Sequence, residues 1–485
     1  MPDHTKSSQP CDTHSAECPL MLPHAHPASP VTTDAAAGTP SGPIPPPSTP
    51  PSRASLMRQI LALGAPTTAL SLLMVVAQLV ETWLAARQGT AALAGWAVML
   101  PFGLVLQQMS TGAMGGGVVS AVAQALGAGR RDEAQALVLH ALIIATGFGL
   151  VFALGVSALA PALITAVAGA EAARQASPYA FWVFGGGAVA SWWGNTLASV
   201  LRGGGQHGIT AKVLATSSAA LPLLAWGLAE GAGLGLTGVG LAVAIQAWVA
   251  ALAMVVLVRH GRAGFVPVLR ARPRWPLFKR ILAVGAVASA LALIGNLATI
   301  LVTAQLRVYG PVTVAAYGIA ARLEFLIVPI AFGVGSALTA LVGRSVGAGD
   351  WVTARRIAWL GGWIALAVTG VIGLAVGLWP LTFASMFTPD PQVRAIAAGA
   401  LRYTGFGFGG FGIGMAMYFA ALGAGRMGAP VFGGLARLAI AAGGGAILSQ
   451  FWGQDGNFIA VALGIVAYGV INAMGVNGRS WRAQS

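Results

Sequence analysis

The sequence contains two related halves, and this repeat restricts the possible fold more than any other feature. The stretch GTAALAGWAVML…SAVAQALGAGRRDEAQ, residues 89–135, returns as GPVTVAAYGIAA…TALVGRSVGAGDWVTARR, residues 310–356. Within it, the triplet that starts at Gly127 recurs at Gly347, an offset of 220 residues (347 minus 127). Both copies follow a long apolar run and precede a basic, helix-forming segment. A duplicated apolar half is typical of membrane proteins that build two gates around one central site.

The composition indicates a membrane protein. Of 485 residues, 56% are hydrophobic and 8% are charged, whereas soluble domains carry about 25% charged residues. Apolar stretches of about 20 residues, which is enough to cross a bilayer, recur from residue 59 onward. We predict twelve spans: 59–86, 92–125, 135–160, 177–201, 209–229, 236–259, 280–306, 313–343, 355–382, 396–421, 430–450 and 457–477.

The number of spans sets the symmetry of the repeat. Six spans in each half is an even number, so both halves enter the membrane from the same side and the repeat is parallel. We predict an all-α integral membrane protein with about twelve transmembrane helices in two six-helix lobes. The expected organisation is a tail at 1–54, lobes at 55–260 and 280–478, a basic linker at 261–279 and a second tail at 479–485. Such a chain is expected to be a transporter and not an enzyme.

The net charge of +14 is distributed unevenly between the two sides of the predicted membrane domain. Loops on one side hold most of the basic residues, including Arg202 and those of the 259–280 region. The opposite loops hold only Arg87, Arg174, Arg307, Arg394 and Arg402. The positive-inside rule then places both termini in the cytoplasm. The charge is therefore a topology signal and an attraction for anionic lipids, not a sign of nucleic-acid binding.

The N-terminal tail is rich in Pro, Ser and Thr, lacks apolar periodicity and is expected to be disordered. It holds both cysteines, Cys11 and Cys18, with His24 and His26 nearby. These residues could hold a metal ion, but their spacing matches no zinc pattern. We therefore predict no metal site and no cofactor. The tail also lacks the apolar core of a signal peptide.

Two carboxylates fall clearly within the predicted spans, Glu81 and Glu324. Charged groups at such depth are costly and often functional. Glu81 lies in the first span, with Gln78 on the same helical face. It is expected either to exchange the coupling cation or to be an acid at the outer interface that reaches water or pairs with Arg87.

Glu324 lies in the eighth span, two residues after Arg322. Residues i and i+2 point apart on a helix, so Arg437 in the eleventh span is the other candidate partner. Glu324 is therefore expected either to belong to a cation or substrate site or to form a structural ion pair.

Polar amides inside the spans supply further candidates for a cation or substrate site. They are Gln107, Gln108, Asn195, Gln246, Asn296 and Gln305. Trp182, Trp192, Trp193, Trp226 and Trp248 have large faces that suit organic cations, although most membrane tryptophans are interfacial anchors.

Several stretches resemble the multidrug and toxic compound extrusion (MATE) family. They are ETWLAARQGTAALAGWAV, AVAQALGAGRRDEAQ, LRGGGQH, LGLTGVGLAVAIQAWVAAL and AAYGIAARLEFL, in the order that the family shows. The resemblance covers about residues 59–476. It implies twelve helices in two lobes that form a V, and export of cationic or amphipathic organic compounds in exchange for protons or sodium ions.

The resemblance also implies roles for single residues. Glu81 stands where many bacterial members carry a first-helix Asp that binds the coupling cation, and Pro66 matches the proline about which that helix bends. In the fifth span, Ser217 replaces the family's Asn and Leu221 replaces its Asp. Another branch has carboxylates in spans seven and ten. Here Asn296 lies near the first of these positions, and no carboxylate matches either.

We therefore expect a proton-coupled exporter of organic compounds that works by alternating access. It would be a monomer in a bacterial-type inner membrane, with small organic substrates and membrane lipids as its partners. Sodium coupling and a related flippase of lipid-linked saccharides are the alternatives. The flippase would need a more cationic cavity, and only Arg322 and Arg437 are expected inside the membrane.

Overall fold

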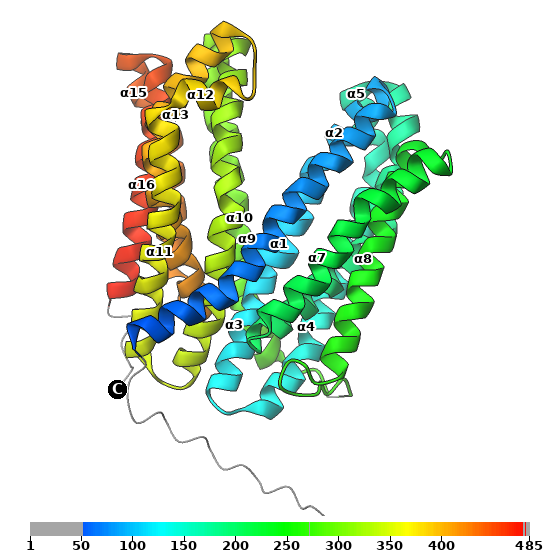
Figure 1. Ribbon diagram of the computed structural model, residues 1–485, viewed down its shortest axis with the longest axis vertical. Coiled ribbons are helices and arrows are strands. Elements are labelled where there is room, and N and C mark those ends of the chain that lie inside the picture. The colour runs from blue at the N-terminus through cyan, green and yellow to red at the C-terminus, as the bar shows by residue number, and fades with distance from the viewer. Residues whose placement is uncertain (1–51, 271, 479–480, 482–485) are drawn as a thin grey trace, which may run out of the picture. The chain divides into compact units, whose positions relative to one another are not determined.

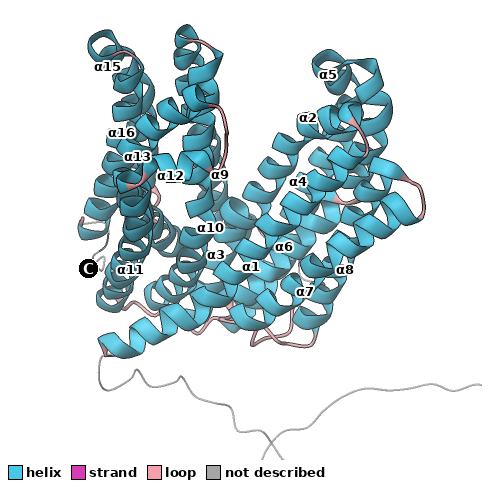
Figure 2. Ribbon diagram, turned by 45° about the horizontal axis from the view of Figure 1, so that its top comes forward, coloured by secondary structure: helices cyan, strands magenta, loops and turns pink. Residues whose placement is uncertain are grey.

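The computed structural model describes residues 52–270, 272–478 and 481. They belong to one compact unit, residues 47–485. All regular elements of the described range are helical, as Figures 1 and 2 show, which confirms the predicted all-α class. The Cys11, Cys18, His24 and His26 cluster lies outside the described residues, so the prediction made for it stays a prediction.

The N-terminal half consists of helices that follow one another with short turns. Several spans contain a π-helical turn, marked η, and run on without a break. The elements are α1 (Arg53–Arg87), α2 (Thr90–Gln107), η1 (Gln108–Ala113), α3 (Met114–Gly127), α4 (Arg131–Val151), η2 (Phe152–Val156), α5 (Ser157–Ala180), η3 (Phe181–Gly186), α6 (Ala188–Gly203), α7 (His207–Trp226), η4 (Gly227–Gly231) and α8 (Gly235–Arg259).

The C-terminal half repeats this plan after the linker. One short helix, α12, lies in a loop, and η5 is a 3₁₀ turn. The elements are α9 (Trp275–Leu306), η5 (Arg307–Tyr309), α10 (Pro311–Gly347), α11 (Trp351–Leu378), α12 (Pro380–Ser385), α13 (Pro391–Ala424), α14 (Gly428–Leu438), η6 (Ala439–Gly444), α15 (Gly445–Trp452) and α16 (Gln454–Asn477).

Eleven helical stretches of the described chain are long and apolar enough to cross a membrane. One of them, Arg131–Gly186, has 56 residues and contains Gly169 with φ 89° and ψ 168°. Only glycine adopts this non-helical conformation readily, so the chain turns there and the stretch comprises two helices. The second helix continues through α6. Counted this way, the described chain has the twelve spans that the sequence predicts.

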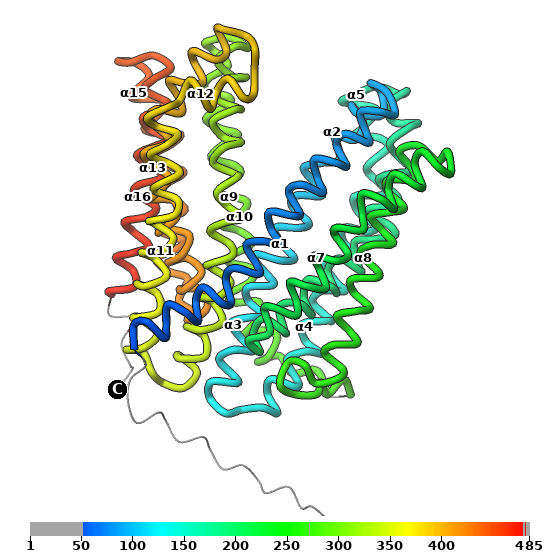
Figure 3. The backbone as a smooth tube through the Cα atoms, in the orientation of Figure 1, coloured from blue at the N-terminus to red at the C-terminus, as the bar shows by residue number. Residues whose placement is uncertain are grey.

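The helices form two bundles. The first turns of α1 pack in the C-terminal bundle, and the first turns of α9 pack in the N-terminal bundle. Leu56 and Ile60, at the start of α1, pack in an apolar cluster with Leu338 and Ile357 of the C-terminal half. In return, Ile281 at the start of α9 packs in the large cluster of the N-terminal half. The path of α1 from one bundle to the other can be followed in Figures 1 and 3. Each half therefore anchors the other.

The two repeated glycine triplets meet at one end of the molecule. Gly127 ends α3 and Gly347 ends α10. A Cβ atom on Gly127 would lie 2.0 Å from the carbonyl oxygen of Arg344, and one on Gly347 would lie 2.1 Å from that of Gln124. Residues 124 and 344 are themselves one repeat apart, so the two contacts are reciprocal. We call this pair of contacts the glycine contact.

Candidate functional site

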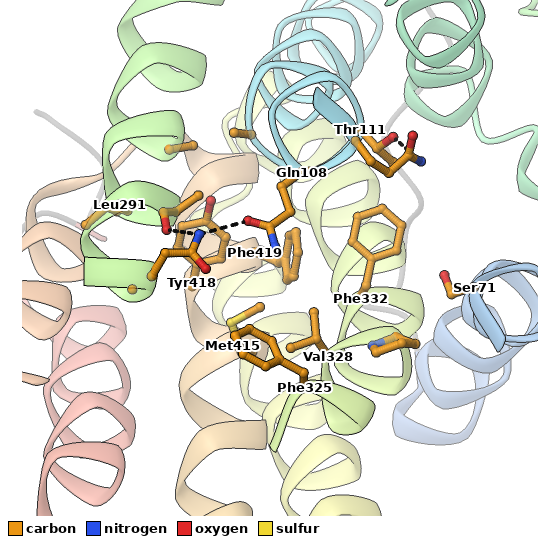
Figure 4. Close-up of a pocket in the computed structure, with 18 of the residues that line it drawn as sticks. Ser71, Gln108, Thr111, Leu291, Phe325, Val328, Phe332, Met415, Tyr418 and Phe419 are labelled. Carbon is orange, nitrogen blue, oxygen red and sulfur yellow. Dashed lines mark hydrogen bonds between the residues drawn. The ribbon is translucent and has the colours of Figure 1, made fainter. Parts of the chain in front are cut away.

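A cavity of about 370 Å³ lies between the two halves, and we call it the central cavity. Helices α1, α2, α6 and α7 line it from the N-terminal half, and α9, α10, α13, α14 and α16 from the C-terminal half. Its wall contains the aromatic rings of Phe325, Phe332, Phe411, Tyr418, Phe419 and Tyr468. Figure 4 labels four of them, Phe325, Phe332, Tyr418 and Phe419. An apolar, aromatic cavity of this size suits a drug-sized organic molecule.

Polar side chains of the N-terminal half gather on the cavity wall at the π-helical turn η1. Asn195 Nδ2 donates to Ser110 Oγ at 2.8 Å and to Gln107 Oε1 at 3.4 Å. Gln107 Nε2 in turn donates to Thr111 Oγ1 at 3.1 Å. A π-helical turn inserts an extra residue into the helix, a feature that is frequent at functional sites. Of the predicted amides, Gln107 and Asn195 are thus brought together.

A hydrogen bond connects the two halves across the central cavity. Asn296 Nδ2 of α9 donates to Gln108 Oε1 of η1 at 3.3 Å and to its own helix at Ala292 O at 3.0 Å (Figure 4). Both side chains line the cavity. The sequence predicted these two amides separately and gave no signal that they meet.

Glu324 also lines the central cavity and forms an ion pair with Arg437 of α14. The Arg437 guanidinium also lies 5.3 Å from the centre of the Phe411 ring. Arg322 is exposed and forms no ion pair with any residue that the structure describes, because its position two residues from Glu324 turns it to another face of the helix. Of the two cations considered for Glu324, Arg437 is therefore the one in contact.

Arg202 corrects the sequence analysis. The prediction ended the fourth span at residue 201 and placed Arg202 in a loop, but α6 runs to Gly203. Arg202 is 3% exposed and lines the central cavity, where its guanidinium lies 5.9 Å from the centre of the Phe332 ring. Arg202 therefore belongs to α6 and to the cavity wall, and its predicted position in a loop is wrong. The error arose because span edges are the least certain part of a sequence prediction.

Glu81 lies outside the central cavity and inside the N-terminal half. Its Oε1 accepts hydrogen bonds from Trp96 Nε1 at 3.1 Å and from Tyr179 OH at 2.5 Å. Arg87 does not pair with it, since Arg87 forms a two-pronged ion pair with Glu230 at 2.9 and 3.2 Å. The alternative of a Glu81–Arg87 pair is therefore wrong, and nothing in the sequence singled out Trp96 or Tyr179.

The other predicted polar residues lie away from the central cavity. Ser217 Oγ accepts from Gln246 Nε2 at 3.3 Å, and Gln305 Nε2 donates to Ala442 O at 2.7 Å. Gln78 is partly buried on α1. None of these four, and none of the five tryptophans considered above, is among the described residues that line the cavity.

Pro66 and Leu221 lie within α1 and α7. The helix α1 continues through Pro66 as one 35-residue element. In the part of the chain that the structure describes, no group of three or more His, Cys, Asp or Glu residues could hold a metal ion.

Comparisons with known proteins identify relatives of both sequence and fold. A family model described as MatE matches residues 66–226 and 286–451, more than half of the chain. The sequence is 28% identical over 348 residues to the probable multidrug resistance protein NorM of Xanthomonas campestris, which covers 67% of this chain and 72% of that protein.

Two further comparisons are with an FAD transporter, by sequence, and with a MATE transporter of known structure. The sequence is 24% identical over 333 residues to the FAD transporter of Shewanella oneidensis, covering 65% of this chain and 71% of that one. The Vibrio cholerae MATE transporter VcmN in its bent form matches with a TM-score of 0.81 at 20% identity, over 88% of this chain and 98% of that chain. This likeness shows a shared fold.

Proposed function

Because the chain belongs to the MATE family, we propose that it is a secondary active transporter that exports amphipathic organic compounds. The observation that carries this proposal is the central cavity, which lies between two repeated halves, is lined by residues of both and takes its aromatic rings from the C-terminal half. The names of its relatives, a probable multidrug resistance protein and an FAD transporter, agree with an organic cargo.

Glu81 is the proposed coupling residue, and its contacts favour a proton over a sodium ion. The Trp96 indole is only a donor of hydrogen bonds and cannot ligate a cation. Sodium prefers several oxygen ligands, and the fifth-span acid of the family is replaced by Leu221. A proton needs only the carboxylate itself. The coupling ion is therefore proposed to be H⁺, with no other cofactor.

Helix α1 provides the proposed link between the proton and the cargo. It carries Pro66, then the cavity-lining residues Leu70, Ser71 and Met74, and then Glu81. Protonation of Glu81 would remove a negative charge and weaken its two hydrogen bonds, since charged acceptors bind donors more strongly. The released helix could then bend near Pro66, move the cavity wall and expel the cargo. The two halves would thus alternate between two packings.

The orientation in the membrane follows from the charge of the loops. The basic loops lie at the end of the molecule that holds the glycine contact, so we place this end in the cytoplasm. The protein is then an inner-membrane exporter with both termini inside. We expect it to act as a monomer, to contact membrane lipids and to have no enzymatic activity.

Transport into proteoliposomes tests the function and the coupling ion. The cargo would be two rhodamine dyes that differ in charge, and proton and sodium gradients would be imposed separately. We expect the proton gradient alone to drive dye transport in the wild type. Glu81→Gln should lose this transport, because the amide cannot exchange a proton. Glu171→Gln, which changes an acid that is exposed on α5, is the matched control and should retain it.

Each contrary result has a separate meaning. Proton-driven transport by Glu81→Gln at the wild-type rate would contradict the role of Glu81. Transport driven by sodium alone would contradict proton coupling. If no gradient moved either dye but the protein flipped a lipid-linked saccharide, the flippase alternative would replace the export proposal.

A further inference from the structure

The charged residues on the wall of the central cavity do not balance. Among the described residues that line it, three are charged: Arg202, Glu324 and Arg437. Glu324 and Arg437 form an ion pair with each other, so their charges compensate. The charge of Arg202 remains, and the cavity therefore carries an excess of one positive charge.

Arg202 is deeply buried and lacks an acceptor. It is 3% exposed, and the Phe332 ring lies 5.9 Å from its guanidinium. No hydrogen bond or ion pair joins its side chain to any other residue within the described ranges. A guanidinium has five N–H donors, and a buried charge without a partner is costly. An anion inside the cavity would supply the acceptor that the Arg202 guanidinium lacks.

We propose that Arg202 is an anion-binding residue of the central cavity, and that the preferred cargo is an aromatic compound that carries a carboxylate. The proposal rests on the proposed export function and specifies its substrate class. The planar guanidinium matches both oxygens of a carboxylate. Rings of the C-terminal half that line the same cavity, such as Phe332 and Phe419 (Figure 4), can pack against an aromatic system.

The expected preference is opposite to that of a cation-binding cavity. An organic cation without a carboxylate would enter next to the unpaired Arg202 and be repelled by it. The Glu324 carboxylate does not relieve this repulsion, because Arg437 already pairs with it. A cargo with both charges would bind Arg202 through its carboxylate and place its positive group at a distance.

The equilibrium binding of two matched dyes distinguishes a cavity that prefers a carboxylate from one that prefers a cation. Rhodamine 110 carries a free carboxylate on the phenyl ring attached to its xanthene, and rhodamine 123 is its methyl ester with a net positive charge. Binding of each dye to the purified full-length protein would be measured by fluorescence anisotropy in detergent, without any ion gradient. The wild type is expected to bind rhodamine 110 about tenfold more tightly, as a charge-assisted hydrogen bond provides.

Variants of Arg202 should change the two affinities in different ways. Arg202→Gln should weaken the binding of rhodamine 110 by about tenfold or more. The same variant should bind rhodamine 123 as tightly as the wild type or more tightly. Arg202→Lys, which keeps the charge but loses the fork, should retain part of the preference. Arg262→Gln, at an exposed position of the linker, is the matched control and should behave as the wild type.

Several outcomes would overturn the proposal. The first is a wild type that binds the ester as tightly as the acid, which needs no variant and is independent of folding. The second is an Arg202→Gln variant that loses affinity for both dyes equally, together with an Arg202→Lys variant that binds both dyes with the same affinity. This result would indicate a structural role for Arg202. If both dyes are transported in proteoliposomes without a charge preference, the export function stands and only the role of Arg202 fails.

Discussion

At the scale of single residues, Glu81 and Glu324 differ in the side chains that contact their carboxylates. Glu81 accepts hydrogen bonds from two neutral donors, Trp96 and Tyr179, whereas Glu324 is paired with the cation Arg437. A proton that binds Glu81 therefore leaves no unpaired charge behind. A proton that binds Glu324 would leave Arg437 buried without a partner, which is costly. This difference makes Glu81 the better residue for a cycle of protonation.

The Glu324–Arg437 pair can be tested by a double-mutant cycle. We expect Glu324→Gln to destabilise the protein by about 3 kcal/mol, because it leaves a mostly buried arginine unpaired. Arg437→Gln should cost a similar amount, and the double variant should cost clearly less than the two together. Thermal unfolding in detergent measures each value. Additive costs would mean that the pair contributes nothing to stability and that Glu324 has another role.

The sequence predicted some of these residues for sound physical reasons and missed others. An acid within an apolar stretch is visible because it is costly there, so Glu81 and Glu324 were found. Arg202 was missed because it follows the predicted end of a span by one residue, and sequence does not fix helix ends so closely. Tyr179 and Trp96 were missed because their contact with Glu81 depends on how three helices pack.

At the scale of the elements, the repeated glycines have a packing role. Gly127 and Gly347 end two equivalent helices, and each lies against a backbone carbonyl of the other half. Beside them, Ser120 Oγ and Gln124 Nε2 of α3 donate to Gly423 O of α13 at 3.1 and 2.8 Å. The glycine contact therefore closes the two halves against each other at this end, and a side chain there would keep them apart.

A methyl group at the glycine contact should open this end of the molecule. In Gly347→Ala the new Cβ would lie 2.1 Å from Gln124 O, and overpacking of this kind costs about 1–3 kcal/mol. That is enough to shift the population of two packings by about 5- to 150-fold. A cysteine at Ser120, which is 2% exposed, should then react faster with a polar thiol reagent, in a background with serine at Cys11 and Cys18.

Gly399→Ala is the control for this experiment, since a Cβ at that glycine meets no atom within 4 Å. It should leave the labelling rate at Ser120→Cys unchanged. Equal labelling in Gly347→Ala and Gly399→Ala would contradict the role of the glycine contact in closure.

The spans themselves were predictable, and their packing was not. Length and hydropathy predicted twelve spans, and the all-α class, the repeat and the family are confirmed. The exchange of the first turns of α1 and α9 between the halves had no signal, because an apolar residue does not specify which apolar surface it meets. The turn at Gly169 could be suspected only from its glycine, in a chain with 67 of them.

At the scale of the whole molecule, α1 connects three regions. Its first turns pack with the C-terminal half, its middle lines the central cavity, and Glu81 near its end is held by Trp96 and Tyr179. A movement of α1 that breaks one of these contacts must affect the others, because they share one continuous helix. Proton and cargo are therefore expected to compete, although Glu81 does not line the cavity.

This competition predicts that acid weakens cargo binding. If the deprotonated form of Glu81 favours the packing that binds cargo, then cargo must equally favour proton release, because linkage is reciprocal. The affinity for rhodamine 110 should thus fall as the pH is lowered in the wild type, by about tenfold or more. Glu81→Gln mimics the protonated form and should bind weakly at every pH. Anisotropy titrations of both proteins across the same pH range measure this, and a parallel pH dependence in Glu81→Gln would assign the effect to another group.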